Sequence, residues 1–440
     1  MGVSRGALTF TRLFVQGKPP KDLRKRYLDA VRLRKFTPLA PEDEASEAIG
    51  WCVIERPFDL DFQPDRIFYD RFVQLGFRVD KWKIPGVLMK SQVADEEQRM
   101  LSRAGREKLT RAEKEDIKLR VIGRLRKKIL PTSRAFDVLW DLDAGTVLFF
   151  THSARATEEF AALFQTTFGL ELQTDSPYAA ALRTQLSPAL QKVFDKVEPV
   201  SFSAGRKAKN ALDKVRLGDD EAPSKGRGKA DAREEDEAEE QDEEQDEETS
   251  ELMERIESTR FLGAELLLWV WLRQELFNEP VALGKLGEAE VWIDRQLTLE
   301  HVLDKLERVV VRGSQPSGSP EAREAVRNMK LPVSGRLVLR IAEQDFAFAF
   351  NAPRFLIGGG AIPALLKEEG DDAFLERTSL IERLTGLLDA LFAAFLRERL
   401  APAWAKAWQP ALVAWMEGES VPASVLKEIA AATRAAKRSA

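Results

Sequence analysis

The sequence predicts an α+β protein with mixed strands and helices in two folded regions. Segments in which apolar residues alternate with polar ones are interleaved with segments of helical periodicity. A long basic helical segment lies in the first half, and a highly charged stretch separates the two regions. With 440 residues, 44% of them hydrophobic, the chain is long enough for two or three domains with sizeable cores.

The first region, residues 1–202, alternates between strand-like and helix-like patterns. We expect strands at Leu8–Val15, Ile49–Ile54, Ile67–Leu75, Phe77–Lys83 and Gly86–Lys90, and a hairpin formed by Phe136–Leu142 and Thr146–Phe150. We expect helices over Lys21–Lys35, from Ser91 with an interruption near Gly105, over residues 110–129 and over His152–Phe168. Thr110 and Glu113 have the spacing of a capping box, and Pro131 stops the basic helix that begins there.

Residues 203–258 differ in composition from both flanking regions. They are rich in Lys, Gly, Glu, Asp and Gln and nearly free of aromatic residues, so we expect a disordered charged linker. Within it, Asp231–Glu251 holds fourteen acidic residues and one Arg, a formal charge of −13. Since the whole chain carries −5, the remaining residues carry +8, and the folded regions are therefore basic.

The second region, residues 259–440, begins with an apolar helix at Phe261–Val270 and ends in helices. We expect strands near Glu290–Ile293, Arg308–Arg312, Gly335–Ile341 and Phe346–Phe350, followed by helices over Asp372–Leu400, Ala403–Met416 and Pro422–Arg438. Trp404, Trp408 and Trp415 recur at helical spacings, and we favour core or dimer packing for them over base stacking.

The composition also indicates the cellular compartment. Cys52 is the only cysteine, so no intrachain disulfide can form and a reducing compartment is expected. No segment approaches the roughly 18 uninterrupted apolar residues of a membrane span, and the N-terminus lacks the pattern of a signal peptide. We expect a cytoplasmic protein.

The basic helical segment is the most informative feature for function. Between Ile117 and Arg134 the chain has seven Lys or Arg residues and no Asp or Glu. On a helical wheel, Ile117, Val121, Leu125 and Ile129 form an apolar stripe, whereas three cations fall in a separate arc of about 60°. Such a concentration of cations predicts a polyanionic partner and salt-sensitive, largely sequence-independent binding of DNA. The candidate contact residues are Lys118, Arg120, Arg124, Lys127, Lys128 and Arg134.

A solvated helix face with ordinary ion pairs is the alternative interpretation of this segment. Asp116 can pair with Arg120 four residues later. Arg124, Lys127 and Lys128 have no acidic neighbour within a turn, which favours the polyanion.

Several short motifs, taken in order, resemble the family of recombination-associated protein RdgC over about residues 1–175. They are Phe36-Thr37-Pro38-Leu39, Ile49-Gly50-Trp51, Arg106-Glu107-Lys108-Leu109 with Glu113-Lys114, Ile129-Leu130-Pro131 and Arg134-Ala135-Phe136. The resemblance implies a non-enzymatic protein that binds double-stranded DNA as a closed homodimeric ring in the nucleoid. It also implies antagonism of the RecA recombinase, because the ring occupies the DNA. The chain departs from the family in its Pro131-Thr132-Ser133-Arg134 sequence and in its long charged insertion.

The sequence leaves two other classes of function open, a metal-dependent nuclease and an interaction scaffold. Asp141 and Asp143 alternate near a strand end, as ligands in a metal-dependent nuclease would, although a turn is the favoured interpretation. His152, His301 and Cys52 cannot build a zinc site, and no metal or cofactor is expected. The Gly358-Gly359-Gly360 segment lacks the ending of a phosphate loop and indicates a turn.

The acidic run Asp231–Glu251 indicates the remaining alternative, an interaction scaffold that does not bind DNA directly. In that case the run binds a basic partner. The same run can instead compete with DNA inside the chain, or act only as a solvated spacer.

Overall fold

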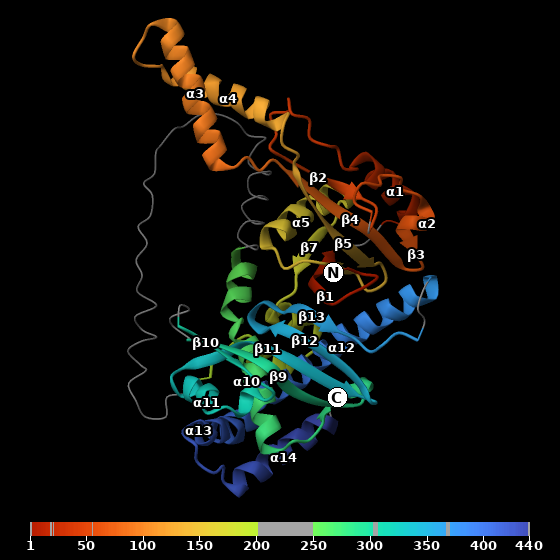
Figure 1. Ribbon diagram of the computed structural model, residues 1–440. Helices are drawn as coiled ribbons and strands as arrows, with labels where there is room; N and C mark the ends of the chain where they lie inside the picture. The colour runs from red at the N-terminus through yellow and green to blue at the C-terminus, as the bar shows by residue number, and fades with distance from the viewer. Residues whose placement is uncertain are drawn as a thin grey trace, which may run out of the picture. The chain divides into compact units, whose positions relative to one another are not determined.

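The structure is a computed structural model that describes residues 2–17, 20, 22–54, 56–200, 250–301, 307–366 and 370–438 (Figure 1). It divides into two compact units, Met1–Thr174 and Asp175–Ala440. Each unit has an antiparallel sheet together with helices, which confirms the predicted α+β class. Most of the expected linker, including nearly all of its acidic run, lies outside the described residues.

Unit 1 is built on one antiparallel sheet. Its elements are β1 (Leu8–Gln16), α1 (Leu23–Leu33), β2 (Glu47–Cys52), α2 (Pro64–Ile67), β3 (Phe68–Tyr69), β4 (Phe72–Lys81), α3 (Gly86–Ala104), α4 (Arg111–Arg126), β5 (Thr132–Asp141), β6 (Thr146–Phe149), α5 (Ala154–Phe168) and β7 (Glu171–Thr174). The strand order is β7-β1-β6-β5-β4-β2, and β3 forms a short hairpin with β4.

The core of unit 1 lies between this sheet and helices α1 and α5. Phe160, Phe164 and Phe168 of α5 are spaced four residues apart, so they share one helix face, and all three are buried. Phe160 stacks on Phe149 of β6 with ring centroids 4.3 Å apart. Burying each large aromatic side chain contributes about 1.5–3 kcal/mol, so this layer fixes α5 firmly on the sheet.

Three predictions about the first region are wrong. The expected strand Ile67–Leu75 is interrupted by a turn at residues 70–71, where the chain reverses from β3 into β4. The expected strand Gly86–Lys90 is the first turn of α3, because Met89 and later apolar residues of this helix pack against α4. The strand expected at Phe77–Lys83 is not separate from the residues before it, because β4 runs through Gly76 as one strand. A Cβ atom at Gly76 would lie 2.6 Å from the Cys52 sulfur, so glycine serves here for close packing between strands rather than for a turn.

Unit 2 also has one antiparallel sheet, with strand order β10-β9-β11-β12-β13 and β8 paired to β9. Its first elements are α6 (Pro177–Arg183), α7 (Pro188–Phe194), α10 (Phe261–Leu276), β8 (Val281–Ala282), η1 (Gly284–Leu286), β9 (Glu288–His301), β10 (Arg308–Arg312), η2 (Pro316–Gly318) and α11 (Pro320–Arg327). They are followed by β11 (Lys330–Ile341), β12 (Gln344–Asn351), η3 (Ala352–Arg354), β13 (Leu356–Ala361), α12 (Asp371–Leu400), η4 (Trp404–Trp408), α13 (Gln409–Glu417) and α14 (Ala423–Arg438).

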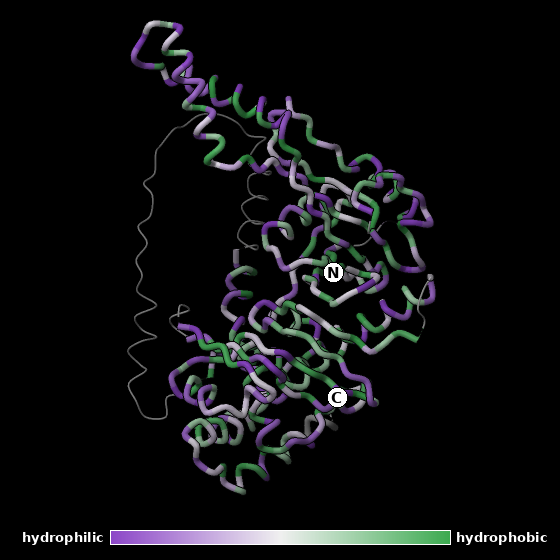
Figure 2. Tube along the Cα trace, viewed as in Figure 1, coloured by the Kyte–Doolittle hydropathy of each residue, from purple (hydrophilic) through white to green (hydrophobic). Residues whose placement is uncertain are grey.

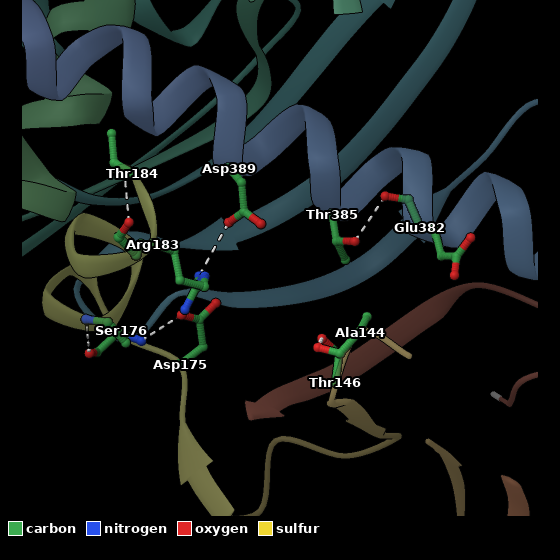
Figure 3. A network of polar contacts seen from close by, with 11 residues as sticks. Ala144, Thr146, Asp175, Ser176, Arg183, Thr184, Glu382, Thr385 and Asp389 are labelled. Carbon is green, nitrogen blue, oxygen red and sulfur yellow. Dashed lines mark hydrogen bonds and ion pairs between the residues drawn. The ribbon is translucent and has the colours of Figure 1, made fainter. Parts of the chain in front are cut away.

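Residues 175–200 belong to unit 2, whereas the sequence analysis placed them in the first region. Polar contacts hold them there. Arg183 of α6 binds Asp175 at 2.9 Å and Asp389 of α12 at 3.3 Å (Figure 3). The Val200 amide donates to the carboxylate of Glu265 in α10 at 2.8 Å. These long-range contacts involve residues that no local pattern connects.

Helix α10 is apolar on all sides and buried from Leu262 to Arg273. The two charged groups within this buried stretch are paired inside unit 2. Arg399 donates to Glu265 at 2.6 Å, and Arg273 donates to Glu398 at 3.4 Å. Burial raises the pKa of both carboxyl groups, and each arginine opposes that shift. The pairing makes it possible for a charged residue to lie within a fully buried helix.

Three details of the second region differ from the sequence expectations. Gly358, Gly359 and Gly360 lie in strand β13 rather than in a turn. The expected helix Ala403–Met416 begins with a π-helical turn, η4, before α13. Residues 250–258, placed in the linker, are helical, with Leu252 and Ile256 half-buried one turn apart.

Candidate nucleic-acid interface

The basic helix α4 begins at a fully formed capping box, as predicted. The Thr110 amide donates to Glu113 at 2.8 Å, and the Glu113 amide donates back to the Thr110 hydroxyl at 3.3 Å. These bonds, together with one from Arg106, hold the pKa of Glu113 below its usual value. The helix ends at Arg126 rather than at Ile129, because the chain turns over Lys127–Ile129 ahead of Pro131.

The predicted apolar stripe of α4 is confirmed. Ile117, Val121 and Leu125 are buried, and Ile129 packs beside them half-buried. Their partners are apolar side chains of α3, including Met89 and Val93, so the two helices lie side by side (Figure 1). Hydrophilic residues alternate with hydrophobic ones along both helices (Figure 2). One side of α4 is therefore anchored, and its cations are held on a fixed support.

Lys118 and Arg120 are exposed and form ion pairs within the helix. The Lys118 ammonium lies 3.9 Å from Glu115, and Arg120 lies 3.1 Å from Asp116 as the spacing indicates. Exposed pairs of this kind are weak, because water screens the charges and ordering two long side chains costs entropy.

Arg124 and Lys127 have acidic partners, which the sequence analysis did not expect. Arg124 lies 3.4 Å from Glu96 of α3 and donates to Gln92 at 3.1 Å. Lys127 lies 3.1 Å from Glu42, and this contact lowers the pKa of Glu42. The expectation failed because both carboxylates come from other segments, which a search within one helical turn cannot reach.

Arg126 is a structural cation. It is buried, its guanidinium lies over the Trp82 ring at 5.8 Å, and it donates to the carbonyl oxygen of Asp43. It therefore fixes the C-terminal end of α4 against the segment after β4. The apolar stripe and this contact together define which side of α4 faces solvent.

Lys128 and Arg134 are exposed and form no ion pair with any described residue. Lys128 lies just beyond α4, and Arg134 lies on β5 opposite Val79 of β4. The six candidate residues thus fall into a group on and just after α4 and a single residue on the sheet.

Sequence reasoning missed the cations that surround Arg134. Lys81, Lys83 and Arg155 line the same cavity as Arg134, although they belong to β4, the segment after it and α5. Each lies in a segment of ordinary charge, so no local excess marks it. The strand register is the signal that would have found Lys81, since β4 and β5 are paired.

The carboxylates proposed for a nuclease form a turn, as the favoured interpretation held. Asp141 accepts from the amides of Asp143 and Ala144 at 2.9 and 3.0 Å and lies 3.1 Å from Arg71. Asp143 is exposed. Across the described part of the chain, no group of three or more His, Cys, Asp or Glu side chains is placed to hold a metal ion.

The remaining candidates are structural. Trp404, Trp408 and Trp415 are buried in unit 2, as core packing requires. Cys52 is buried in unit 1, and burial raises the pKa of its thiol to about 12. No helix among the described residues is both long and apolar enough to cross a membrane.

The chain was compared with models of protein families and with curated proteins, and neither comparison gave a match.

Proposed function

We propose that this protein binds double-stranded DNA with little sequence preference and without catalysing a reaction on it. The observation that carries the proposal is the exposed set of cations on and just after α4, held on a helix whose opposite side is packed and whose end is anchored by Arg126. Backbone phosphates lie at regular intervals whatever the sequence, so a fixed row of cations suits them.

The ion pairs of α4 are compatible with this proposal. Lys118, Arg120, Arg124 and Lys127 each pair with a carboxylate, but all four cations are at least 40% exposed as side chains. A phosphate can therefore replace the carboxylate without uncovering a buried charge.

The finer features of the proposal come from the resemblance to the RdgC family. They are a homodimer that closes into a ring around the duplex, a place in the nucleoid, and restraint of the RecA recombinase through occupation of DNA. The order of the family's motifs over residues 1–175 supports them.

Anisotropy titration of a labelled linear duplex over a salt series tests the binding. Each phosphate contact lowers the slope of log K against log salt by about 0.9, so four contacts give a slope of about −4. Two duplexes of unrelated sequence should bind equally and remain uncut with Mg²⁺ present. A flat salt dependence, a strong preference for one sequence or a cleaved product would contradict the proposal.

Separate measurements test the ring and the recombinase. Light scattering of the free protein should give twice the chain mass. A closed circular duplex should retain the protein through a salt wash that removes it from a short linear duplex. A closed protein ring can leave DNA only by sliding over a free end, and a circular duplex has no free end. Strand exchange by a RecA recombinase should slow in proportion to the fraction of duplex that the protein occupies. Unchanged strand exchange at full occupancy would contradict the proposed restraint of the recombinase.

A further inference from the structure

A second group of cations lies on the sheet of unit 1, at one edge of its helix-covered face. In the antiparallel ladders, Arg134 of β5 lies opposite Val79 of β4, and Lys81 lies opposite both Thr132 of β5 and Glu47 of β2. Residues directly opposite each other point to the same face of a sheet, and so do residues two apart along a strand. These side chains therefore project together.

They surround a cavity of about 150 Å³ that the first turns of α5 also border. Its apolar lining consists of Val79, Phe136 and Ala156. Its charged lining consists of Lys81, Lys83, Arg134, Arg155, Glu47 and Glu159. Four cations, which come from β4, the segment after it, β5 and α5, thus line one small cavity.

The two carboxylates of the cavity leave two cations uncompensated. Glu47 lies 3.0 Å from Lys81 and 2.6 Å from Arg155, and Glu159 lies 2.6 Å from Arg155. Lys83 and Arg134 are exposed and form no ion pair with any described residue. The cavity therefore has a net formal charge of +2. Its two unpaired cations are available to an external anion.

The chemistry of the lining favours a phosphate group. A guanidinium can donate hydrogen bonds to two phosphate oxygens at once, and an ammonium adds a positive point charge. Ligand pockets that enclose a whole small molecule measure about 300–1,000 Å³, so this cavity is too small for a nucleotide. A single phosphate belonging to a larger polymer fits both its size and its charge.

One cation of the cavity is adjacent in sequence to a residue that contacts the basic helix. Trp82, against which Arg126 of α4 packs, is the residue before Lys83. The end of α4 is thereby fixed next to one of the two available cations of the cavity.

We propose that this cavity is a phosphate-binding site that holds one backbone phosphate of DNA, with Lys83 and Arg134 as its principal contacts. The inference rests on the proposed duplex binding and assigns to it a second contact point, apart from the cations of α4. The site adds affinity without sequence preference, because it touches phosphate only.

The test compares the double variant Lys83→Ala, Arg134→Ala with the control Lys25→Ala, Arg26→Ala. The control removes the same charge from exposed positions on α1. In the anisotropy titration, the cavity variant should bind duplex about tenfold more weakly near 0.15 M salt, and the magnitude of its salt slope should fall by about 1, as expected for the loss of one phosphate contact. The control should change both quantities little, and both variants should keep the thermal melt of the wild type.

The outcomes separate this inference from the proposed function. If the wild type binds duplex and the cavity variant binds like the control, the inference fails and duplex binding stands. If the wild type does not bind duplex, the proposed function fails and the inference with it. Titration with ADP and with inorganic phosphate gives the other arm: tight, saturable binding of ADP that is lost in the cavity variant, with unchanged duplex binding, would assign the cavity to free nucleotides and overturn the inference.

Discussion

The guanidinium of Arg126 lies 5.8 Å from the centre of the Trp82 ring and links the end of the basic helix to the segment that follows β4. Arg126 is one of seven cations between Ile117 and Arg134, yet it is the buried one. A cation in a basic run can therefore stabilise the fold while its neighbours remain accessible to a ligand.

Replacing Arg126 with Met should lower the free energy of unfolding by about 1–3 kcal/mol, because the variant loses the contact with Trp82 and the bond to the Asp43 carbonyl. The loss is expected at the lower end, since the Arg126 Nε atom has no hydrogen-bond partner among the described residues. Lys128→Met is the matched control, because Lys128 is exposed. Urea denaturation measures both variants, and equal stability would show that Arg126 is not an anchor.

Two helical glycines in unit 2 should respond in opposite directions to alanine. Alanine normally stabilises a helix by about 1 kcal/mol over glycine, and Gly386 of α12 has open space where the new methyl group would lie. At Gly263 of α10 the same methyl group would collide with the backbone of Ala352. We expect Gly386→Ala to stabilise by about 1 kcal/mol and Gly263→Ala to destabilise by about 2 kcal/mol or more. Thermal melts of the two variants and the wild type measure these changes in stability. A Gly263→Ala variant as stable as the wild type would contradict the close packing of α10 on η3.

Cys52 should make the stability of the protein depend on pH in the alkaline range. Burial raises the pKa of its thiol from 9.0 to about 12, so the unfolded chain loses this proton before the folded chain does. The stabilisation is present in full below about pH 9 and is lost as the pH rises towards 12.

The measurement compares the wild type with Cys52→Ala, because other titrating groups cancel in the difference. The unfolding free energy of the wild type should fall relative to the variant by up to about 1.4 kcal/mol per pH unit above pH 9. Iodoacetamide should also label native Cys52 much more slowly than the denatured chain, since only the thiolate reacts. Equal labelling rates would mean that the thiol is accessible in the folded protein.

Local patterns in the sequence were sufficient for much of the fold. The capping box at Thr110 and the apolar stripe from Ile117 were predicted because their determinants lie within one or two turns of helix. The strand Arg308–Arg312 was predicted with its observed bounds for the same reason. Gly86–Lys90 was wrong because contacts with α4, which follows it in the chain, decided its conformation.

The candidate site was predictable only in part, because several of the charged groups that contact its cations are distant from them in the sequence. The row of cations on α4 is visible in the sequence, whereas Glu42 and Glu96 approach it through folding of the chain. The cavity beside Arg134 depends on strand register and on the position of α5, and neither is written in a local pattern.

The pairing of Arg124 with Glu96 and of Lys127 with Glu42 leads to the last prediction. If phosphates replace these carboxylates on binding, part of the binding energy is spent on separating the two pairs. Neutralising both acids in the variant Glu42→Gln, Glu96→Gln should then tighten duplex binding several-fold at low salt, and the gain should shrink as salt screens the pairs. Reversing the cations, in Arg124→Glu, Lys127→Glu, should instead weaken binding strongly, since each change replaces an attraction to phosphate with a repulsion.

The control for the neutralised variant is Asp65→Asn, Asp143→Asn, which removes the same charge from exposed positions on α2 and in the turn between β5 and β6. A general loss of negative charge would tighten binding equally in both variants, whereas competition at α4 tightens it in the first one only. Anisotropy titrations at two salt concentrations give the comparison. Equal affinities for the two variants would mean that Glu42 and Glu96 do not compete with DNA, and unchanged binding after reversal of Arg124 and Lys127 would remove these two cations from the DNA surface.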